Sequence, residues 1–290
     1  MARRLFLIIC LADILWAVSP RLLKADKPYF VTYDDEMEEP GNLEISFNPL
    51  LGLPQTAPGF LGGWTEFEYG ARGWWTTEFY LDAQATRGQG EIFTGYRWEN
   101  RFHPLANEHW INPVLYVEFE NTNGADKALA EVVGHDSVDD LAVPNSEARE
   151  EKEREIETKL ILSSNYKGWN ISENLIGEKN LANEPWEFGY AVGISRPLAL
   201  AASPEPCGFC RENLKAGAEI YGGLGTWHQF GLPGTAHYLG PVLDWDLPSG
   251  PSFRISPTVG LNKNSARFLI RFGVSYEIPR FDRVIRRWFR

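Results

Sequence analysis

The sequence predicts an all-β fold: an antiparallel up-and-down barrel of about twelve strands that crosses a membrane. Most candidate strands are about 9 to 11 residues long, which suits a strand crossing a bilayer at a tilt of about 45°. Strands of soluble proteins centre on about 5 or 6 residues. Apolar side chains occupy one face from strand to strand and charged side chains the other, as in a barrel with lipid outside and a polar interior. Short turn signals fall at alternate connections.

The N-terminus has the features of an export signal. Ala2-Arg3-Arg4 is positively charged, and an apolar stretch from Leu5 to Val18 follows it. Residues 1–25 are therefore predicted to be a signal peptide, with a buried N-terminal helix as the alternative. The stretch is shorter than a membrane-spanning helix, and no later run of about 20 apolar residues occurs. Residues 26–41 are expected to form an N-terminal segment in the periplasm.

Composition excludes one class of partner. The net charge is −11, whereas nucleic-acid binding requires a basic face. The chain is rich in aromatic residues and contains 27 glycines, which fits sheets whose ends carry aromatic girdles. No cofactor is expected.

The barrel is predicted to cover residues 42–277. The predicted strands are 42–48, 62–70, 73–83, 90–99, 113–121, 154–164, 167–176, 186–195, 212–221, 237–246, 252–262 and 266–277.

The last of these strands shows the alternation most clearly. One face holds Phe268, Ile270, Phe272, Val274 and Tyr276. Successive side chains of a strand point to opposite faces, so this face is predicted to contact lipid. A soluble antiparallel sheet with one solvated face gives the same alternation, which leaves a secreted β-sandwich binding protein as an alternative.

The strand at 90–99 follows the general assignment of faces, whereas the strand at 167–176 raises a question of register. In the strand at 90–99, Ile92 is assigned to the lipid face and Glu91 to the interior. The strand at 167–176 is less regular, because Glu173 shares a face with Trp169 and Ile171.

Connections alternate in length. The tight turn signals are Gly70–Gly73, Asn165–Gly168 and Pro248–Pro251. With a periplasmic N-terminus these turns fall in the periplasm, where outer-membrane barrels keep their short turns. The long acidic connection 122–153 is then extracellular. Two connections fit this scheme less well, because 100–112 and 196–211 are long yet should be periplasmic.

Together these features resemble a Gram-negative outer-membrane β-barrel, with a looser similarity to transporter barrels of the phenol-degradation-associated type. The resemblance covers residues 42–277 and implies an outer-membrane location and assembly by the barrel-assembly machinery. It also implies contact with outer-membrane lipids and lipopolysaccharide. We expect a monomer. Such barrels usually end on an aromatic residue, whereas residues 278–290 continue as a basic, aromatic tail. The tail is either an interfacial segment or a frayed terminus.

The charged face is where solutes would pass. The candidate lumen-lining residues are Glu66, Glu68, Glu118, Glu120, Glu155, Glu157, Arg254, Arg267 and Arg271. Acids outnumber bases on this face, which favours cations over anions. The charges either line an aqueous path or pair with one another and fill the interior. We therefore expect a passive channel for small cationic or neutral solutes, with a non-conducting structural or adhesive barrel as the alternative.

The cysteine pair Cys207 and Cys210 is predicted to form a disulfide, the default in an exported protein. Free thiols are one alternative. A zinc site would need two more ligands, and the nearest histidines in sequence are His228 and His237. No metal site is predicted.

The connection 122–153 also contains a possible enzyme motif. His135-Asp136-Ser137 and Asn145 resemble the His-x-Ser and Asn arrangement of outer-membrane phospholipase A. The triplet lies in a polar loop rather than at the rim of a lipid-facing strand, and the spacing to Asn145 does not fit. The chain is not predicted to be an enzyme. The loop is expected to be a constriction, a divalent-cation surface or a solvated loop.

Overall fold

The fold is described from a computed structural model. It covers residues 28–128, 141–182, 184–203, 205 and 207–288. The predicted signal peptide at 1–25 and the motif His135–Ser137 lie outside the described residues.

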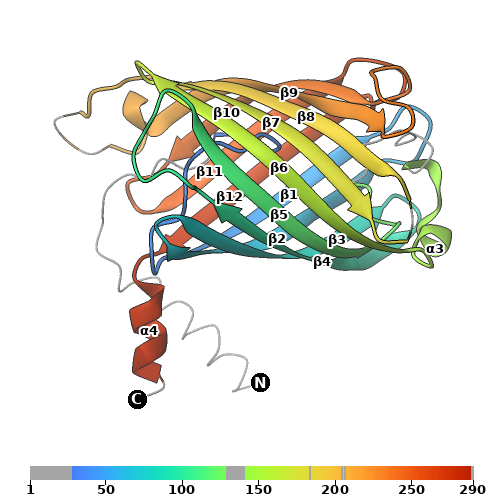
Figure 1. The fold of residues 1–290 in the computed structure, drawn as a ribbon, viewed down its shortest axis with the longest axis horizontal. Helices are drawn as coiled ribbons and strands as arrows, with labels where there is room; N and C mark the ends of the chain where they lie inside the picture. Colours follow the sequence, from blue (N-terminus) through green and yellow to red (C-terminus); the bar gives the residue numbers. More distant parts are fainter. Residues whose placement is uncertain (1–27, 129–140, 183, 204, 206, 289–290) are drawn as a thin grey trace.

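Within these residues, twelve strands form one closed antiparallel barrel (Figure 1). The strands are β1 (Leu43–Leu53), β2 (Phe60–Arg72), β3 (Trp75–Thr86), β4 (Gly90–Phe102), β5 (Asn112–Asn123), β6 (Lys152–Tyr166), β7 (Trp169–Asn180), β8 (Trp186–Pro197), β9 (Leu214–Thr226), β10 (His237–Asp246), β11 (Pro251–Gly260) and β12 (Phe268–Ile278). Each strand pairs with its neighbours in sequence, and β1 pairs with β12. Closure leaves no unpaired sheet edge. The predicted fold class is confirmed, and the β-sandwich alternative is wrong because one sheet closes on itself.

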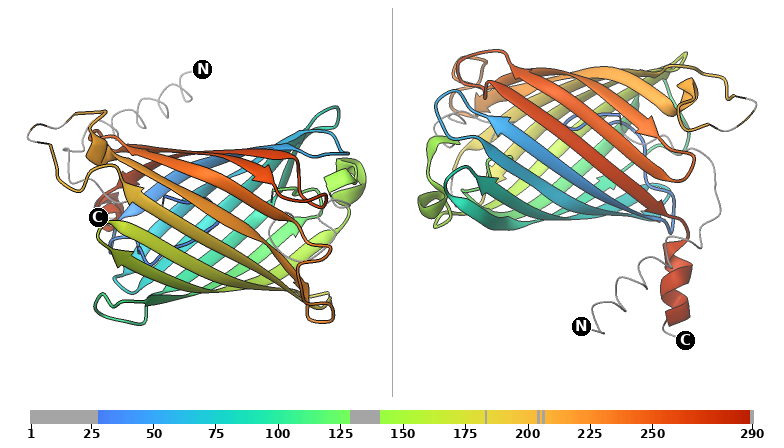
Figure 2. Two further views of the ribbon diagram at one scale, coloured as in Figure 1. Left: turned by 90° about the horizontal axis from the view of Figure 1, so that it is seen from above. Right: turned by 180° about the vertical axis from the view of Figure 1, so that it is seen from behind.

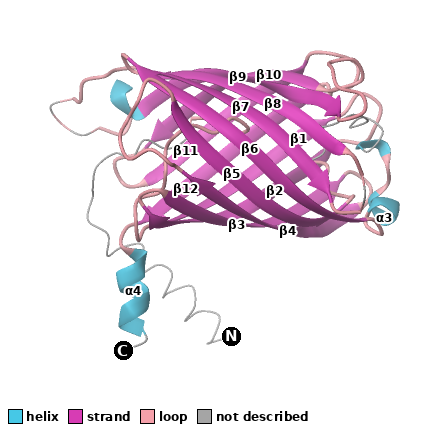
Figure 3. Ribbon diagram, in the orientation of Figure 1, coloured by secondary structure: helices cyan, strands magenta, loops and turns pink. Residues whose placement is uncertain are grey.

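Short helices lie at the two ends of the barrel. These are α3 (Asn145–Ala148), the 3-10 helix η1 (Arg211–Asn213) and α4 (Phe281–Trp288), coloured cyan in Figure 3. No helix in the described part of the chain is long and apolar enough to span a membrane.

The outer surface of the barrel is apolar around its circumference. Phe79, Leu115, Leu175, Leu243 and Phe272, on five different strands, are each at least 40% exposed. Water would penalise so much exposed apolar area, whereas lipid does not. The alternation predicted from the sequence therefore places the apolar face outward, as expected.

A β-bulge reverses the prediction for part of β4. The pairing with β3 shifts between Asp82 and Ala83, so β4 contributes one extra residue there. Beyond the bulge Glu91 pairs with the outward Ala85, and Phe93 is 58% exposed. Glu91 therefore faces outward rather than into the interior.

The structure explains why the predicted apolar face of β7 contains an acidic residue. Glu173 lies on the outer face with Trp169, Ile171 and Leu175, all exposed. The predicted parity was correct, and one acidic side chain lies on the otherwise apolar surface.

The ends of the barrel differ in their connections. The start of β1, the end of β12 and helix α4 share one end, and α3 lies at the other (Figure 2). The end with α4 has the tight turns β2–β3 and β6–β7, together with the longer connections before β5 and β9. The mixed pattern expected from 100–112 and 196–211 is therefore present.

The tail beyond the barrel is partly helical. A left-handed residue, Arg280, with φ of 56°, separates β12 from α4. The Arg280 backbone N–H donates to the Asn42 side chain, which ties the turn to the first strand. The helix runs across the barrel axis rather than along it (Figure 1).

Candidate functional site

The N-terminal segment, residues 28–40, passes through the interior of the barrel. Tyr29, Thr32, Asp34 and Glu38 are each at most 2% exposed, and the dark blue coil lies inside the strands in Figure 2. Residues 26–41 were expected to lie outside the barrel in the periplasm. The described part instead lies against inward side chains of the wall, because its backbone finds hydrogen-bonding partners there.

Glu219 on β9 binds the backbone of the segment. Its carboxylate accepts hydrogen bonds from the N–H groups of Val31 (3.0 Å) and Thr32 (3.1 Å), and from Phe30 at 3.3 Å. Arg254 on β11 donates to the Tyr29 carbonyl at 3.0 Å. Charge-assisted bonds of this kind are about twice as strong as neutral ones.

A second anchor binds the next residue of the segment, Tyr33. The Asn174 side chain on β7 both accepts from the Tyr33 N–H (2.6 Å) and donates to the Tyr33 carbonyl (2.8 Å). The Tyr33 hydroxyl donates to Glu99 at 3.0 Å, and its ring packs edge-on against Tyr116, with centroids 5.2 Å apart.

Glycine makes room for the segment at two points of the wall. A Cβ at Gly193 would lie 2.6 Å from the Tyr29 ring. A Cβ at Gly70 would lie 2.1 Å from the Glu39 carbonyl oxygen. Real Cβ contacts are longer, so larger residues at these positions would displace the segment.

Arg101 is the centre of a buried ionic cluster on β2, β3 and β4. Its guanidinium contacts the carboxylates of Glu68, Glu78 and Glu99, the last at 3.0 Å. It also donates to the Glu36 carbonyl at 3.1 Å, which connects the cluster to the segment. The Arg101 side chain is 0% exposed. The register places these residues together, since Glu78 pairs with both Glu68 and Glu99.

Further inward charges also occur in pairs. Arg97 contacts Asp82 at 3.1 Å and Glu118 at 3.2 Å, and Lys159 contacts Glu157 at 2.8 Å. On the opposite wall, Lys215 contacts Asp244 and Asp246, each at 3.2 Å. These ion pairs form a polar core in this part of the interior. The sequence left two possibilities, an aqueous path lined by charges and an interior filled by paired charges, and these contacts are of the second kind.

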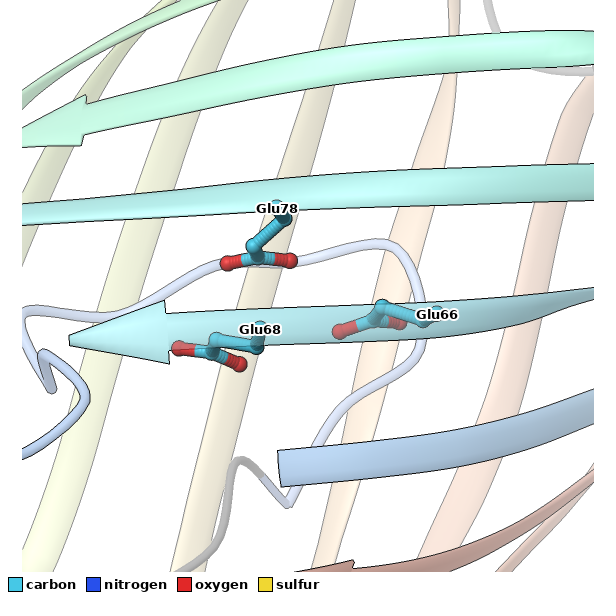
Figure 4. A group of neighbouring side chains, drawn as sticks. All are labelled: Glu66, Glu68 and Glu78. Carbon is cyan, nitrogen blue, oxygen red and sulfur yellow. The ribbon is translucent and has the colours of Figure 1, made fainter. Parts of the chain in front are cut away.

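Two groups of three carboxylates have oxygens close enough to share a cation. They are Glu66, Glu68 and Glu78, shown in Figure 4, and Glu118, Glu120 and Glu157. Oxygen ligands suit calcium or magnesium. However, Arg101 already contacts Glu68 and Glu78, and Arg97 and Lys159 contact Glu118 and Glu157. Side-chain cations therefore already offset part of the charge that a metal ion would neutralise.

Eight of the nine predicted lumen-lining residues point inward. Glu66 accepts hydrogen bonds from Ser46 and Asn48, Glu155 accepts one from Asn180, and Arg271 lies over the Tyr221 ring. The residues with inward side chains are Glu66, Glu68, Glu118, Glu120, Glu155, Glu157, Arg254 and Arg271. Arg267 differs: it is exposed at the barrel rim, one residue before β12 begins. The predicted strand extended slightly too far.

Sequence reasoning gave two important interior residues no role as anchors. Glu219 and Asn174 hold the segment, yet neither is among the candidate lumen-lining residues. A possible signal was the run Tyr29-Phe30-Val31-Thr32-Tyr33, which is apolar and aromatic but too short for a strand of this barrel. A run of this kind needs a buried partner.

A small cavity adjoins the segment. A cavity of about 50 Å³ lies between the segment and β1–β4, bordered by Phe30, Tyr33, Trp64 and Glu66 among others. It has room for a few water molecules.

The long connection between β5 and β6 packs into the end of the barrel that carries α3. Ala125, Asp126 and Lys127 are buried, and the Lys127 N–H donates to Gln84 at 2.9 Å. The Lys127 ammonium donates to the Leu141 carbonyl at 3.0 Å, and burial lowers its pKa. This part of the expected extracellular loop is therefore packed against the barrel wall rather than solvated.

Asp126 should make this packing depend on pH. Burial, and secondarily the Asp82 carboxylate, raise its pKa to about 6 from 3.8. The folded state therefore binds an extra proton between about pH 4 and 6, and packing weakens as pH rises through that range, by up to about 3 kcal/mol. We expect hydrogen exchange at residues 124–128, corrected for intrinsic rates, to be slower at pH 5 than at pH 8. Asp126→Asn should abolish the difference; an unchanged difference would show that another group titrates.

Cys207 and Cys210 form a disulfide at the end of the barrel that carries α4. Phe209, between them, stacks on Trp245 with ring centroids 4.4 Å apart. The Trp245 indole N–H donates to the Gly208 carbonyl at 2.6 Å. The disulfide loop is thus attached to the outer face of β10. His237, considered as a zinc ligand, instead hydrogen-bonds Tyr190 and Thr235.

Comparisons with known proteins support the fold. An outer-membrane channel from Pseudomonas putida F1 superposes with a TM-score of 0.56 at 9% identity, covering 89% of this chain and 100% of that chain. The NanC porin superposes less closely, with a TM-score of 0.47 at 10% identity, over 81% of this chain and 100% of the porin. No protein-family model and no curated protein matches the sequence.

The chain therefore has the fold of Gram-negative outer-membrane β-barrels. At 9% identity, the similarity to the channel establishes the shared fold and nothing about a solute.

Proposed function

We propose that this protein is an exported outer-membrane channel for small cationic or neutral solutes, closed in the described conformation by residues 28–40. The observation that carries the proposal is the position of this segment. It lies inside the barrel but forms no strand of the wall, and polar side chains such as Glu219 and Asn174 hold it. Polar contacts of this kind exchange with water more readily than a packed apolar core does.

The charge of the wall supports the preference for cations. All strand residues are described, and among them eleven acidic and five basic side chains are buried: Glu44, Glu68, Glu78, Asp82, Glu99, Glu118, Glu120, Glu157, Glu219, Asp244 and Asp246 against Arg97, Arg101, Lys215, Arg254 and Arg271. A low-dielectric wall with an excess of one sign concentrates the opposite ion. Once the segment moves aside, the path would favour cations and penalise anions.

A non-conducting structural barrel is the second candidate. The ion pairs of Arg97 and Arg101 and the small residual cavity favour it, because they fill the interior with fixed contacts. The two candidates differ in one property: whether loosening the segment opens a continuous aqueous path.

Replacing Glu219 with alanine is expected to open the channel part of the time. The substitution removes the acceptor for the backbone N–H groups of residues 30–32, while the barrel wall keeps its own pairing. In planar bilayers we expect several-fold more open time than for the native protein, with a reversal potential that favours potassium over chloride.

Glu120→Ala is the matched control for this experiment. It also removes a buried glutamate from a strand, but in the described structure Glu120 does not hydrogen-bond residues 28–40. Its open time should match the native protein. Equal behaviour of the two variants, or silence of Glu219→Ala, would favour the structural barrel, and chloride selectivity would refute the charge argument.

We also propose that the C-terminal tail lies on the membrane surface. Helix α4 carries Arg283, Arg286 and Arg287 beside Val284 and Ile285, and it runs across the barrel axis. That direction is parallel to the plane of a membrane that the barrel spans. A basic helix with an apolar side suits an anionic interface.

A further inference from the structure

A basic and aromatic patch occupies the outer face of β6, β7 and β8 at the end of the barrel that carries α3. Lys152 and Arg154 alternate with the inward Glu153 and Glu155, so both basic side chains point outward and are exposed. Lys179 on β7 pairs with Ile156 on β6 and Trp186 on β8, which places it on the same outward face.

Two of the basic residues, Arg154 and Lys179, lie close together on the surface. Arg154 is two residues from Ile156, the direct partner of Lys179, and the Leu181 N–H donates to the Arg154 carbonyl at 2.8 Å. Diagonal neighbours of this kind are about 7–8 Å apart, within reach of long side chains. One divalent anion could therefore contact more than one of them.

An open groove of about 370 Å³ adjoins these residues. Lys179, Pro185, Trp186, Trp227 and His228 line it. The Trp227 N–H donates to the Trp186 carbonyl at 2.7 Å, which fixes the loop carrying Trp227 against β8. The two indoles nevertheless remain 39% and 72% exposed.

A second layer of rings supports this groove. Phe188 on β8 packs against Trp227 and against Phe230, with centroids 6.3 and 5.7 Å apart. Phe230 is itself 66% exposed. The groove is thus an exposed aromatic surface. Exposed apolar patches of this kind often mark binding sites.

The position of the patch along the barrel axis and its charge indicate which kind of ligand it would bind. In a lipid-facing wall, a basic residue costs about 2–4 kcal/mol at the midplane but about 0–1 near the interface. The three basic side chains lie at the rim, at headgroup level, with aromatic rings that can contact acyl chains. Within the patch, the Lys179 ammonium also donates a hydrogen bond to the backbone carbonyl of the exposed Glu184.

We propose that this patch binds the phosphorylated glycolipid of the outer leaflet, with Arg154 and Lys179 at a phosphate and the Trp186–Trp227 groove on an acyl chain. The inference rests on the proposed outer-membrane location, with the α3 end facing outward. Its chemistry is that of a lipid bearing phosphates on a sugar headgroup.

The test measures binding of diphosphoryl lipid A to delipidated full-length protein in detergent, by native mass spectrometry or thermophoresis. Arg154→Glu/Lys179→Glu should weaken binding by tenfold or more, because each basic residue near an anionic lipid surface contributes several-fold. Trp227→Ala should weaken it without changing charge. Dephosphorylated lipid A and phosphatidylglycerol should bind the native protein more weakly.

Arg196→Glu is the matched control, since Arg196 is also outward, exposed and next to a tryptophan, but at the other rim. It should leave affinity unchanged. Unchanged binding by the double variant, an equal loss in Arg196→Glu, or equal binding of dephosphorylated lipid would each overturn the proposal. All variants must retain heat-modifiable migration, and Lys179→Ala replaces the double variant if that one misfolds. Binding in detergent needs no open channel, so a negative result is independent of the conductance tests.

Discussion

Replacing Arg101 with methionine is expected to destabilise the barrel by about 3–5 kcal/mol, the largest effect of any single substitution considered for this chain. Arg101 is fully buried and contacts three carboxylates, those of Glu68, Glu78 and Glu99. Methionine fills a similar volume but leaves these charges without their common cation. Breaking a buried ionic cluster costs more than the net value of the cluster itself, because the remaining charges stay desolvated.

The temperature at which heat-modifiable gel migration is lost measures this effect, together with urea unfolding in lipid vesicles. Arg72→Met is the control, since Arg72 is exposed and its guanidinium donates to the neighbouring Ala71 carbonyl rather than to a carboxylate of the cluster. Adding Glu68→Gln and Glu78→Gln to Arg101→Met should recover part of the lost stability, because fewer charges remain unmatched. If Arg101→Met is as stable as Arg72→Met, the cluster does not contribute as described.

The sequence predicts the wall of the barrel well because each strand shows its own alternation of apolar and polar residues. Alternation in β12, for example, depends only on residues within that strand, and Phe272 and Arg271 point as expected. Strand ends are less well defined, since polar rim residues follow either face. The prediction 62–70 accordingly becomes Phe60–Arg72, while Arg267 falls outside β12.

The alternation within a single strand does not predict β-bulges or contacts between residues far apart in the sequence. An extra residue in β4 reverses the faces of Glu91 and Ile92, and nothing in the alternation marks it in advance. The segment at 28–40 is a larger omission. Its partners, such as Glu219 and Arg254, lie about 190 and 225 positions away in sequence. Only the closed sheet brings these residues to one interior.

The candidate site shows the same division. The inward direction of Glu118 and Glu157 follows from strand parity. The contact of Glu118 with Arg97 depends on the register between β5 and β4, whereas Glu157 and Lys159 lie two residues apart on β6. The excess of acids is a property of the sequence alone. Whether it lines a path or fills a core is decided by the segment that occupies the interior.

Deleting residues 28–40 is expected to have the largest functional effect. The segment occupies the interior between Asn174 and Glu99 on one side and Glu219 and Arg254 on the other. Its removal leaves these polar side chains facing the emptied space, which water would enter because the groups it meets there are charged. Gly41 and Asn42 remain, and they keep their contacts with Gly70 and Arg280 at the barrel end.

Single-channel recording of the deletion variant and the full-length chain, refolded and inserted under identical conditions, tests the central claim most directly. Heat-modifiable migration of both proteins establishes that the barrel is folded. We expect a nearly silent full-length protein and a deletion variant with steady conductance at least tenfold higher, selective for potassium over chloride. A folded deletion variant that is as silent as the full-length protein, or a full-length protein that conducts equally, would contradict the claim that residues 28–40 close the barrel.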